Sequence, residues 1–227
     1  MPYILSIETS TKVCSVSLHN EAELVGFSQY FLEKSHSSIL GCLIDEVIRN
    51  SGIEVKDLAA VAISEGPGSY TGLRIGTSST KGLCFGLDIP LIGVNTLLSM
   101  ASGAIGVNIN DALLCPMLDA RRMEVYCIVT NNQLEIIEET KPVIVDENSF
   151  IEYFEKGRVL FFGDGSEKCK SALNHPNALF LDDIHPSAKD VGVLAWEKFK
   201  NEDFVDLTYF EPFYLKAFKA GKPKTLV

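Results

Sequence analysis

Apolar positions along the chain alternate between the two-residue period of strands and the three-to-four-residue period of helices. In the first hundred residues this pattern predicts three strands, then a helix, a strand, a helix, a strand and a helix. The second half has a looser pattern of three strands, a helix, a strand, a short helical segment, a strand and a last helix. The predicted ranges are 3–10, 13–20, 22–31, 35–52, 58–66, 70–88, 90–95 and 96–104, then 111–120, 123–130, 133–145, 148–157, 158–165, 166–174, 177–182 and 187–201.

The similar order of elements in the two halves predicts an α/β protein built from a duplicated β-β-β-α-β-α unit. A Gly- and Asn-rich segment at 102–111 marks the expected boundary between two firmly packed lobes. We expect an N-terminal lobe at 1–104 with the last helix, 187–200, packed back on it. The C-terminal lobe is expected at 105–186 and a C-terminal tail at 205–227.

Composition narrows the class of protein. The 227 residues carry a net charge of −10, which disfavours a protein that binds nucleic acid without a partner. Lys216, Lys219, Lys222 and Lys224 form the nearest approach to a basic run, and we interpret them as part of a mobile tail.

Cysteine and histidine spacing gives no sign of a metal or disulfide framework. The six cysteines include no C-x-x-C pair and lie in apolar surroundings, and no two histidines have the close spacing of a zinc site. No apolar run reaches the length of a membrane helix or resembles a signal peptide. We therefore expect a cytoplasmic protein with buried free thiols, no metal and no membrane association.

A glycine-rich loop, "SEGPGSYTGLRIG", lies between a predicted strand and a predicted helix. A helix N-terminus with free amides suits a phosphate. The loop nevertheless departs from both common templates, because Leu73 stands where a P-loop has Lys and Thr71 stands where a dinucleotide loop has Gly. The loop is therefore either a phosphate cradle or a tight turn for close helix packing.

Two further turns allow a nucleotide or a purely structural interpretation. A carboxylate and hydroxyls in the first strand–strand turn can hold a metal-nucleotide, or can simply make turn hydrogen bonds. A second Gly-Asp-Gly turn ends a strand of the other lobe. The candidate nucleotide residues of all three turns are Glu8, Thr9, Ser10, Gly66, Gly68, Gly163 and Gly165.

The helix after the glycine loop carries small residues at helical spacing, which favours close approach of another helix. That neighbour is either the helix at 37–50 of this chain or a helix of another protein. The candidate partner-interface residues on the two helices are Leu40, Leu43, Val47, Gly72, Gly76, Ser79, Thr80 and Leu83.

The tight turn Asp119-Ala120-Arg121-Arg122 joins two predicted strands. It fits either a salt-bridged hairpin or a surface contact for a partner.

Several segments resemble one family. They are "ILSIETSTKVCSVSL", "EGPGSYTGLRIGTSSTKGLCFGLDIPLIGVNTL", "MLDARRMEVY" and "EPFYLK". They are similar to TsaB (YeaZ), the bacterial partner subunit in tRNA threonylcarbamoyladenosine synthesis. The resemblance is strongest over residues 1–126. It implies a two-lobed actin-like and Hsp70-like (ASKHA) fold, and work on adenosine 37 of tRNA.

The catalytic paralogue in this family, TsaD, has an N-H-x-E-G-H pattern whose histidines bind the catalytic metal. The corresponding residues here begin at Asn95, and Thr96 and Met100 stand at the histidine positions, with Leu98 at the carboxylate position. Neither Thr nor Met replaces an imidazole ligand for such a metal. The resemblance therefore implies a chain without the transferase activity.

We predict a non-catalytic subunit that docks on TsaD through the helices at 37–50 and 71–87, with the ATPase TsaE as a third partner. It would require no cofactor of its own, would meet tRNA only through the complex, and leaves ATP or ADP binding in the complex open. An independent nucleotide-hydrolysing enzyme or peptidase is the alternative. A homodimer using the same helical face is a further possibility in the absence of the paralogue.

Overall fold

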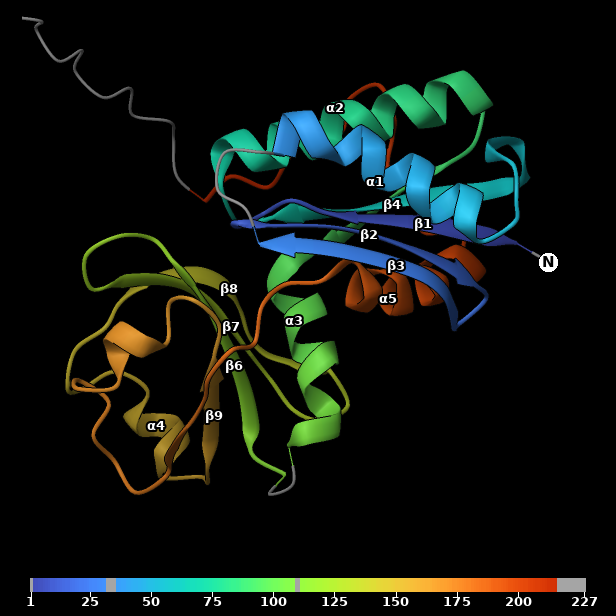
Figure 1. Ribbon diagram of the computed structural model, residues 1–227. Helices are drawn as coiled ribbons and strands as arrows, with labels where there is room; N and C mark the ends of the chain where they lie inside the picture. Colours follow the sequence, from blue (N-terminus) through green and yellow to red (C-terminus); the bar gives the residue numbers. More distant parts are fainter. Residues whose placement is uncertain (1, 32–35, 109–110, 216–227) are drawn as a thin grey trace, which may run out of the picture.

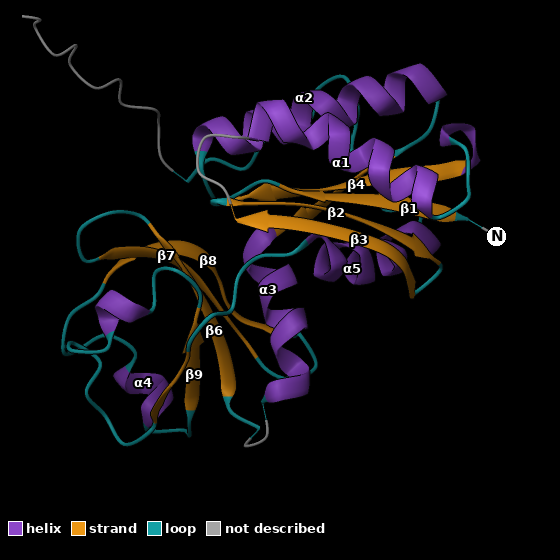
Figure 2. Cartoon of the chain, viewed as in Figure 1, coloured by secondary structure: helices purple, strands orange, loops and turns teal. Residues whose placement is uncertain are grey.

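Two mixed β-sheets, each flanked by helices, form the two halves of the molecule (Figures 1 and 2). The computed structural model describes residues 2–31, 36–108 and 111–215. The strands are β1 (Tyr3–Glu8), β2 (Val13–Asn20), β3 (Glu23–Phe31), β4 (Leu58–Gly66), β5 (Leu91–Asn95), β6 (Leu113–Asp119), β7 (Glu124–Thr130), β8 (Ile136–Ile144), β9 (Val159–Phe162) and β10 (Ala178–Leu181). The α-helices are α1 (His36–Asn50), α2 (Tyr70–Leu87), α3 (Thr96–Ala104), α4 (Ile151–Phe154) and α5 (Ala188–Lys200).

The two sheets have the same topology. The first has the order β3-β2-β1-β4-β5 and the second the order β8-β7-β6-β9-β10, so each strand of one sheet has a counterpart in the other. In both, the first three strands in sequence are antiparallel and the remaining two are parallel additions. The predicted α/β class and the predicted duplication are therefore confirmed in the sheets.

Two of the three helical segments predicted in the second half are much shorter than expected, whereas α5 matches its predicted range of 187–201. The helix expected at 148–157 is the single turn α4, and the segment expected at 166–174 holds only the 3-10 turn Glu167–Cys169. Phe150, which precedes α4, has a left-handed φ of 66° and so cannot extend that helix backwards. Apolar residues of this region pack as a cluster around Phe161 rather than along one helical stripe.

The first sheet is covered on both faces (Figure 1). Leu5 and Ile7 of β1 belong to one cluster with the apolar residues of α1, whereas Ile4 belongs to another cluster with α5. This division follows from the two-residue alternation of side chains along a strand. The α5-facing side also carries polar residues, including Ser6 and Glu8, which are fully buried.

Helix α3 joins the two halves, and α5 packs on the first sheet. The Oγ atom of Ser17 donates to the Ala188 carbonyl at 2.8 Å, and the Ala188 N–H donates to Ser15 Oγ at 2.9 Å, which holds the start of α5 on β2. Helix α3 follows directly from β5, yet its apolar residues share a cluster with Leu114 and Phe162 of the second sheet. The residue limits that we expect for the two lobes stay a prediction.

The segment before residue 215 is held against the first sheet and α2. Val205 forms a bridge with Leu91 of β5, and the Lys81 ammonium donates to the carbonyls of Thr208 and Phe210 at 3.1 and 3.2 Å. The four lysines of the predicted mobile tail, Lys216, Lys219, Lys222 and Lys224, lie outside the described residues. In the described part of the chain, no helix has the length and apolar character required to cross a bilayer.

Candidate functional site

The glycine loop that opens α2 packs directly on the turn after β1. A Cβ atom on Gly68 would lie 2.5 Å from the Ser10 carbonyl oxygen, and one on Gly72 would collide with the Thr9 carbonyl oxygen. Gly76 has the same role one turn later, since a Cβ there would lie 2.8 Å from the Ile63 side chain. These positions require glycine because another part of the chain already occupies the space beside them.

Several groups that could bind a phosphate form hydrogen bonds within the chain instead. Thr9 Oγ1 donates to the Gly72 carbonyl at 2.9 Å, and the Ser69 N–H donates to the Ser10 carbonyl at 2.5 Å. The Gly72 N–H, in the first turn of α2, donates to the capping Ser69 hydroxyl at 3.3 Å. These are the contacts expected of a tight packing turn, and phosphate binding at this loop stays a prediction.

Glu8 is enclosed completely beneath this turn. The Ser10 N–H donates to Glu8 Oε1 at 2.5 Å, while Glu8 Oε2 is buried without a hydrogen-bond partner. Burial raises the pKa of the Glu8 carboxyl, because its charged form loses water, and the hydrogen bonds from Ser10 only partly oppose this. Among the described residues, no group of three His, Cys, Asp or Glu side chains is arranged to hold a metal ion.

The Gly163–Gly165 turn of the second sheet is equally tightly packed. Gly163 has a left-handed φ of 98°, and a Cβ on it would lie 2.8 Å from the Met100 methyl group. A Cβ on Gly165 would lie 2.8 Å from the Leu118 carbonyl carbon. Gly66 likewise has a φ of 119° and lies against the Phe213 carbonyl, so these three glycines serve close backbone packing.

The residues that the resemblance places at the paralogue's metal-ligand positions, Thr96 and Met100, lie inside the protein. Thr96 is fully buried and its Oγ1 accepts the Gly66 N–H at 3.2 Å. Met100 is 1% exposed and belongs to the apolar cluster between α3 and the second sheet. Leu98 packs partly buried against the same cluster. Helix α3 therefore serves as a packing element between the two halves.

Most of the predicted interface residues face the chain's own core. Leu40, Leu43 and Val47 are at most 4% exposed, because α1 packs them onto the first sheet. On α2, Gly72, Gly76 and Thr80 are buried, while Ser79 and Leu83 are half-buried. The structure brings the eight residues together in one layer, but six of them contact this chain and offer no surface to a partner.

The outward face of the two helices consists of different residues. Phe85 of α2 is 83% exposed, and a Cβ built on Gly82 or Gly86 beside it would have no neighbour within 4 Å. Gly41 of α1 is open in the same way. We call the exposed residues of these two helices the α1–α2 face; they are Ser37, Ser38, Gly41, Cys42, Asp45, Arg49, Asn50, Thr71, Arg74, Ser78, Gly82, Phe85 and Gly86.

The segment Thr208–Tyr214 borders the α1–α2 face along α2, which the sequence analysis did not anticipate. The Phe213 N–H donates to the Glu65 carbonyl at 2.7 Å, and the rings of Tyr70 and Tyr214 lie 5.0 Å apart. Tyr209 in this segment is 82% exposed. The sequence "TYFEPFY" indicates that this segment packs on the protein, because four aromatic residues in seven are rare in a solvated tail.

Comparisons with known proteins agree on one family. The family model "tRNA N6-adenosine threonylcarbamoyltransferase" (TsaD) matches residues 16–223. The chain is 32% identical over 223 residues to the tRNA threonylcarbamoyladenosine biosynthesis protein TsaB of Escherichia coli, covering 94% of each. It is 31% identical over 176 residues to TsaB of Bacillus subtilis, covering 75% of this chain and 74% of the relative.

Solved structures share the fold. YeaZ from Pseudomonas aeruginosa superposes with a TM-score of 0.83 at 24% identity, over 95% of this chain and 100% of that one. The activator of 2-hydroxyisocaproyl-CoA dehydratase from Clostridium difficile, solved with bound ADPNP, has a TM-score of 0.52 at 8% identity, over 88% of this chain and 97% of that one. With the duplicated sheets, these similarities confirm the predicted two-lobed ASKHA fold.

Proposed function

The chain belongs to the TsaB family of tRNA threonylcarbamoyladenosine biosynthesis proteins, and from this we propose that it is a non-catalytic subunit whose α1–α2 face binds a TsaD-type catalytic paralogue. The observation that carries the proposal is the exposure of Phe85, at 83%, on a helix face where Gly82 and Gly86 lie beside it. An aromatic ring left in water beside glycines is the arrangement expected of an interface anchor.

The small residues of the α1–α2 face support a helix partner. Gly41, Gly82 and Gly86 leave the backbone of both helices open to close approach. Ten of the thirteen residues of the face are uncharged, so covering it requires the desolvation of only three charged side chains, Asp45, Arg49 and Arg74. This face therefore replaces the buried residues that we first expected to form the interface.

Burial of Thr96 and Met100 supports the non-catalytic role. A catalytic metal at this place would need protein ligands and an open coordination position for a substrate, whereas the side chains of Thr96 and Met100 pack α3 against the rest of the chain. An independent hydrolase would likewise need room for phosphate at the glycine loop, where Thr9 and Ser10 already lie. ATP or ADP binding in the assembled complex stays a prediction.

The wider assembly follows from the family. A TsaE-type ATPase joins the pair as the third partner, tRNA is met through the complex, and the whole acts in the cytoplasm. Without the paralogue, two copies of this chain pair through the same α1–α2 face, because the pairing removes the exposed Phe85 ring from water.

A co-purification experiment with matched glycine variants tests the proposal. Gly82 lies in the α1–α2 face, whereas Gly106 lies in the 3-10 turn after α3, and a Cβ at either would meet nothing within 4 Å. We expect Gly82→Arg to abolish capture of the TsaD-type paralogue from the same organism and Gly106→Arg to leave it intact. Capture that is equal for both variants, or absent for the wild-type chain across salt and nucleotide conditions, would contradict the proposal.

A further inference from the structure

The hairpin between β6 and β7 ends in a loop with unusual backbone geometry. The Ala120 N–H donates to the Glu124 carbonyl at 3.0 Å, and the Glu124 N–H donates to the Arg121 carbonyl at 3.2 Å. Between these bonds, Arg121 and Arg122 have left-handed φ angles of 72° and 54°. Glycine or asparagine normally occupies such positions, because a Cβ atom is unfavourable there.

The two arginines are not needed to hold the hairpin together. Asp119, at its base, accepts the Arg121 backbone N–H at 2.9 Å and forms its ion pair with Lys168. Lys168 Nζ also donates to the Glu124 carbonyl at 2.6 Å. Of the two interpretations of this turn, the salt-bridged hairpin is real, but its salt bridge comes from Lys168 on the neighbouring 3-10 turn.

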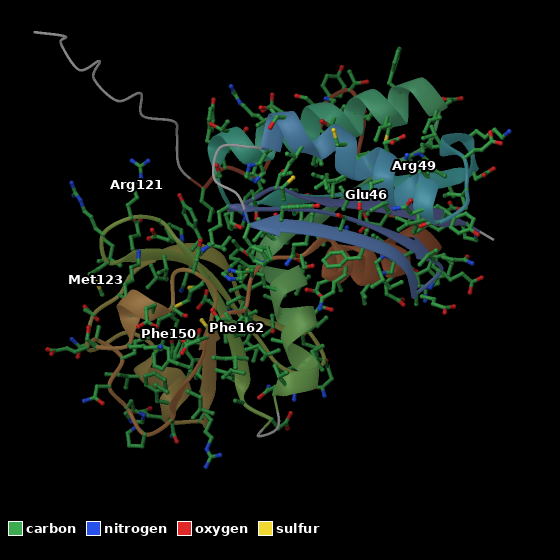
Figure 3. All side chains as sticks on the ribbon, viewed as in Figure 1. Glu46, Arg49, Arg121, Met123, Phe150 and Phe162 are labelled. Carbon is green, nitrogen blue, oxygen red and sulfur yellow. The ribbon has the colours of Figure 1, made fainter. Side chains whose placement is uncertain are left out.

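Both guanidinium groups are therefore available at the tip. Arg121 and Arg122 are exposed, and over residues 2–31, 36–108 and 111–215 neither side chain forms an ion pair. Figure 3 shows the Arg121 side chain pointing away from the ribbon at the outer end of the second sheet. The carboxylate nearest to them, Asp119, is already neutralised by Lys168 and does not repel an incoming anion.

We propose that Arg121 and Arg122 bind the phosphate backbone of the tRNA when this chain is part of the complex, an inference that rests on the proposed function. A guanidinium group offers two parallel N–H donors that match the oxygens of one phosphate. The chain as a whole carries a charge of −10, so contact with RNA is restricted to such a local projection. The contact adds to the affinity supplied by the partner subunits.

The salt dependence of tRNA binding tests this contact. Purified complex of the chain with its TsaD-type paralogue is titrated with labelled tRNA between 50 and 300 mM KCl. The slope of log K against log salt is negative, and each lost phosphate contact makes it less steep by about 0.7–0.9. The Arg121→Ala/Arg122→Ala variant should therefore have a slope that is less steep by about 1.4–1.8. Arg158→Ala, which removes an exposed arginine at the start of β9, should leave the slope unchanged.

A second variant separates binding from folding. Arg121→Gly/Arg122→Gly relieves the left-handed backbone, so its urea midpoint should rise above that of the wild type while its salt slope falls like that of the alanine variant. A structural role for the arginines would instead lower the urea midpoint in both variants.

Each other outcome overturns the inference. Unchanged slopes in an intact complex would show that the tip does not meet RNA. Weaker assembly with an unchanged slope would show that it contacts a protein partner instead. If no complex forms at all, the proposed function fails, and the inference that rests on it falls with it.

Discussion

Truncation of Phe85 is expected to weaken partner binding strongly while leaving the isolated chain folded. The ring is 83% exposed, so only about a sixth of its surface contributes to the stability of the free protein. Full burial of a phenylalanine side chain is worth about 1.5–3 kcal/mol. Phe85→Ala should therefore lower the free energy of unfolding by only about 0.3–0.5 kcal/mol.

The remaining surface of the ring becomes buried only if a partner covers it. That share corresponds to about 1.2–2.5 kcal/mol of binding free energy, or a Kd raised about 8- to 60-fold. Isothermal titration calorimetry of the chain against its TsaD-type paralogue measures the Kd, and urea unfolding of the chain alone measures stability.

The control for this prediction is Ile144→Ala, which removes a side chain that is 74% exposed on β8, away from the α1–α2 face. Its Kd should match that of the wild type. A Kd for Phe85→Ala within twofold of the wild-type value would refute the reasoning, as would a loss of more than about 1 kcal/mol in the unfolding free energy of the isolated chain.

Two further predictions concern stability. Gly72→Ala should destabilise the protein by about 1–3 kcal/mol because its Cβ meets the Thr9 backbone. Gly82→Ala, on the open face of the same helix, should stabilise the protein by about 0.5–1 kcal/mol. Urea unfolding measures both free-energy changes, and two changes of the same sign would contradict the packing described. Burial raises the pKa of Glu8 and raises that of Asp190 to about 6, so the folded state binds these two protons more tightly than the unfolded state does. The wild type should therefore lose stability as the pH rises from about 4 through the raised pKa values of the folded state. Glu8→Gln should flatten that loss in a series of Tm measurements from pH 4 to 8, and an unchanged profile would show that Glu8 is not buried as an acid.

The alternation of apolar residues was sufficient to predict the strands. Strand residues such as Leu5 and Ile7 reveal their burial through a period of two, and all ten predicted strands are present. The same approach overestimated the helical segments at 148–157 and 166–174 but not α5. There, aromatic residues around Phe161 fill a compact cluster, and a cluster of that kind produces apolar positions without any helical period.

The candidate site was predicted only in part, because glycine has no side chain to show which way it faces. Gly72 and Gly82 lie on one helix and look alike in the sequence, yet one contacts Thr9 and the other is open to solvent. The apolar stripe of α1, with Leu40 and Leu43, marks the side that meets the chain's own sheet. The partner face that we propose lies on the opposite side, and it is inferred from the exposure of Phe85.

The sequence by itself determined the family and the duplicated fold, and the resemblance implied that Thr96 and Met100 stand where the paralogue has metal ligands. These are properties of residue type and order. Only the tertiary structure decided that the glycine loop packs on the turn after β1 and that Lys168, rather than an arginine, pairs with Asp119. Such contacts join residues far apart in the chain, and their partners are chosen by how the two sheets and their helices come together in space.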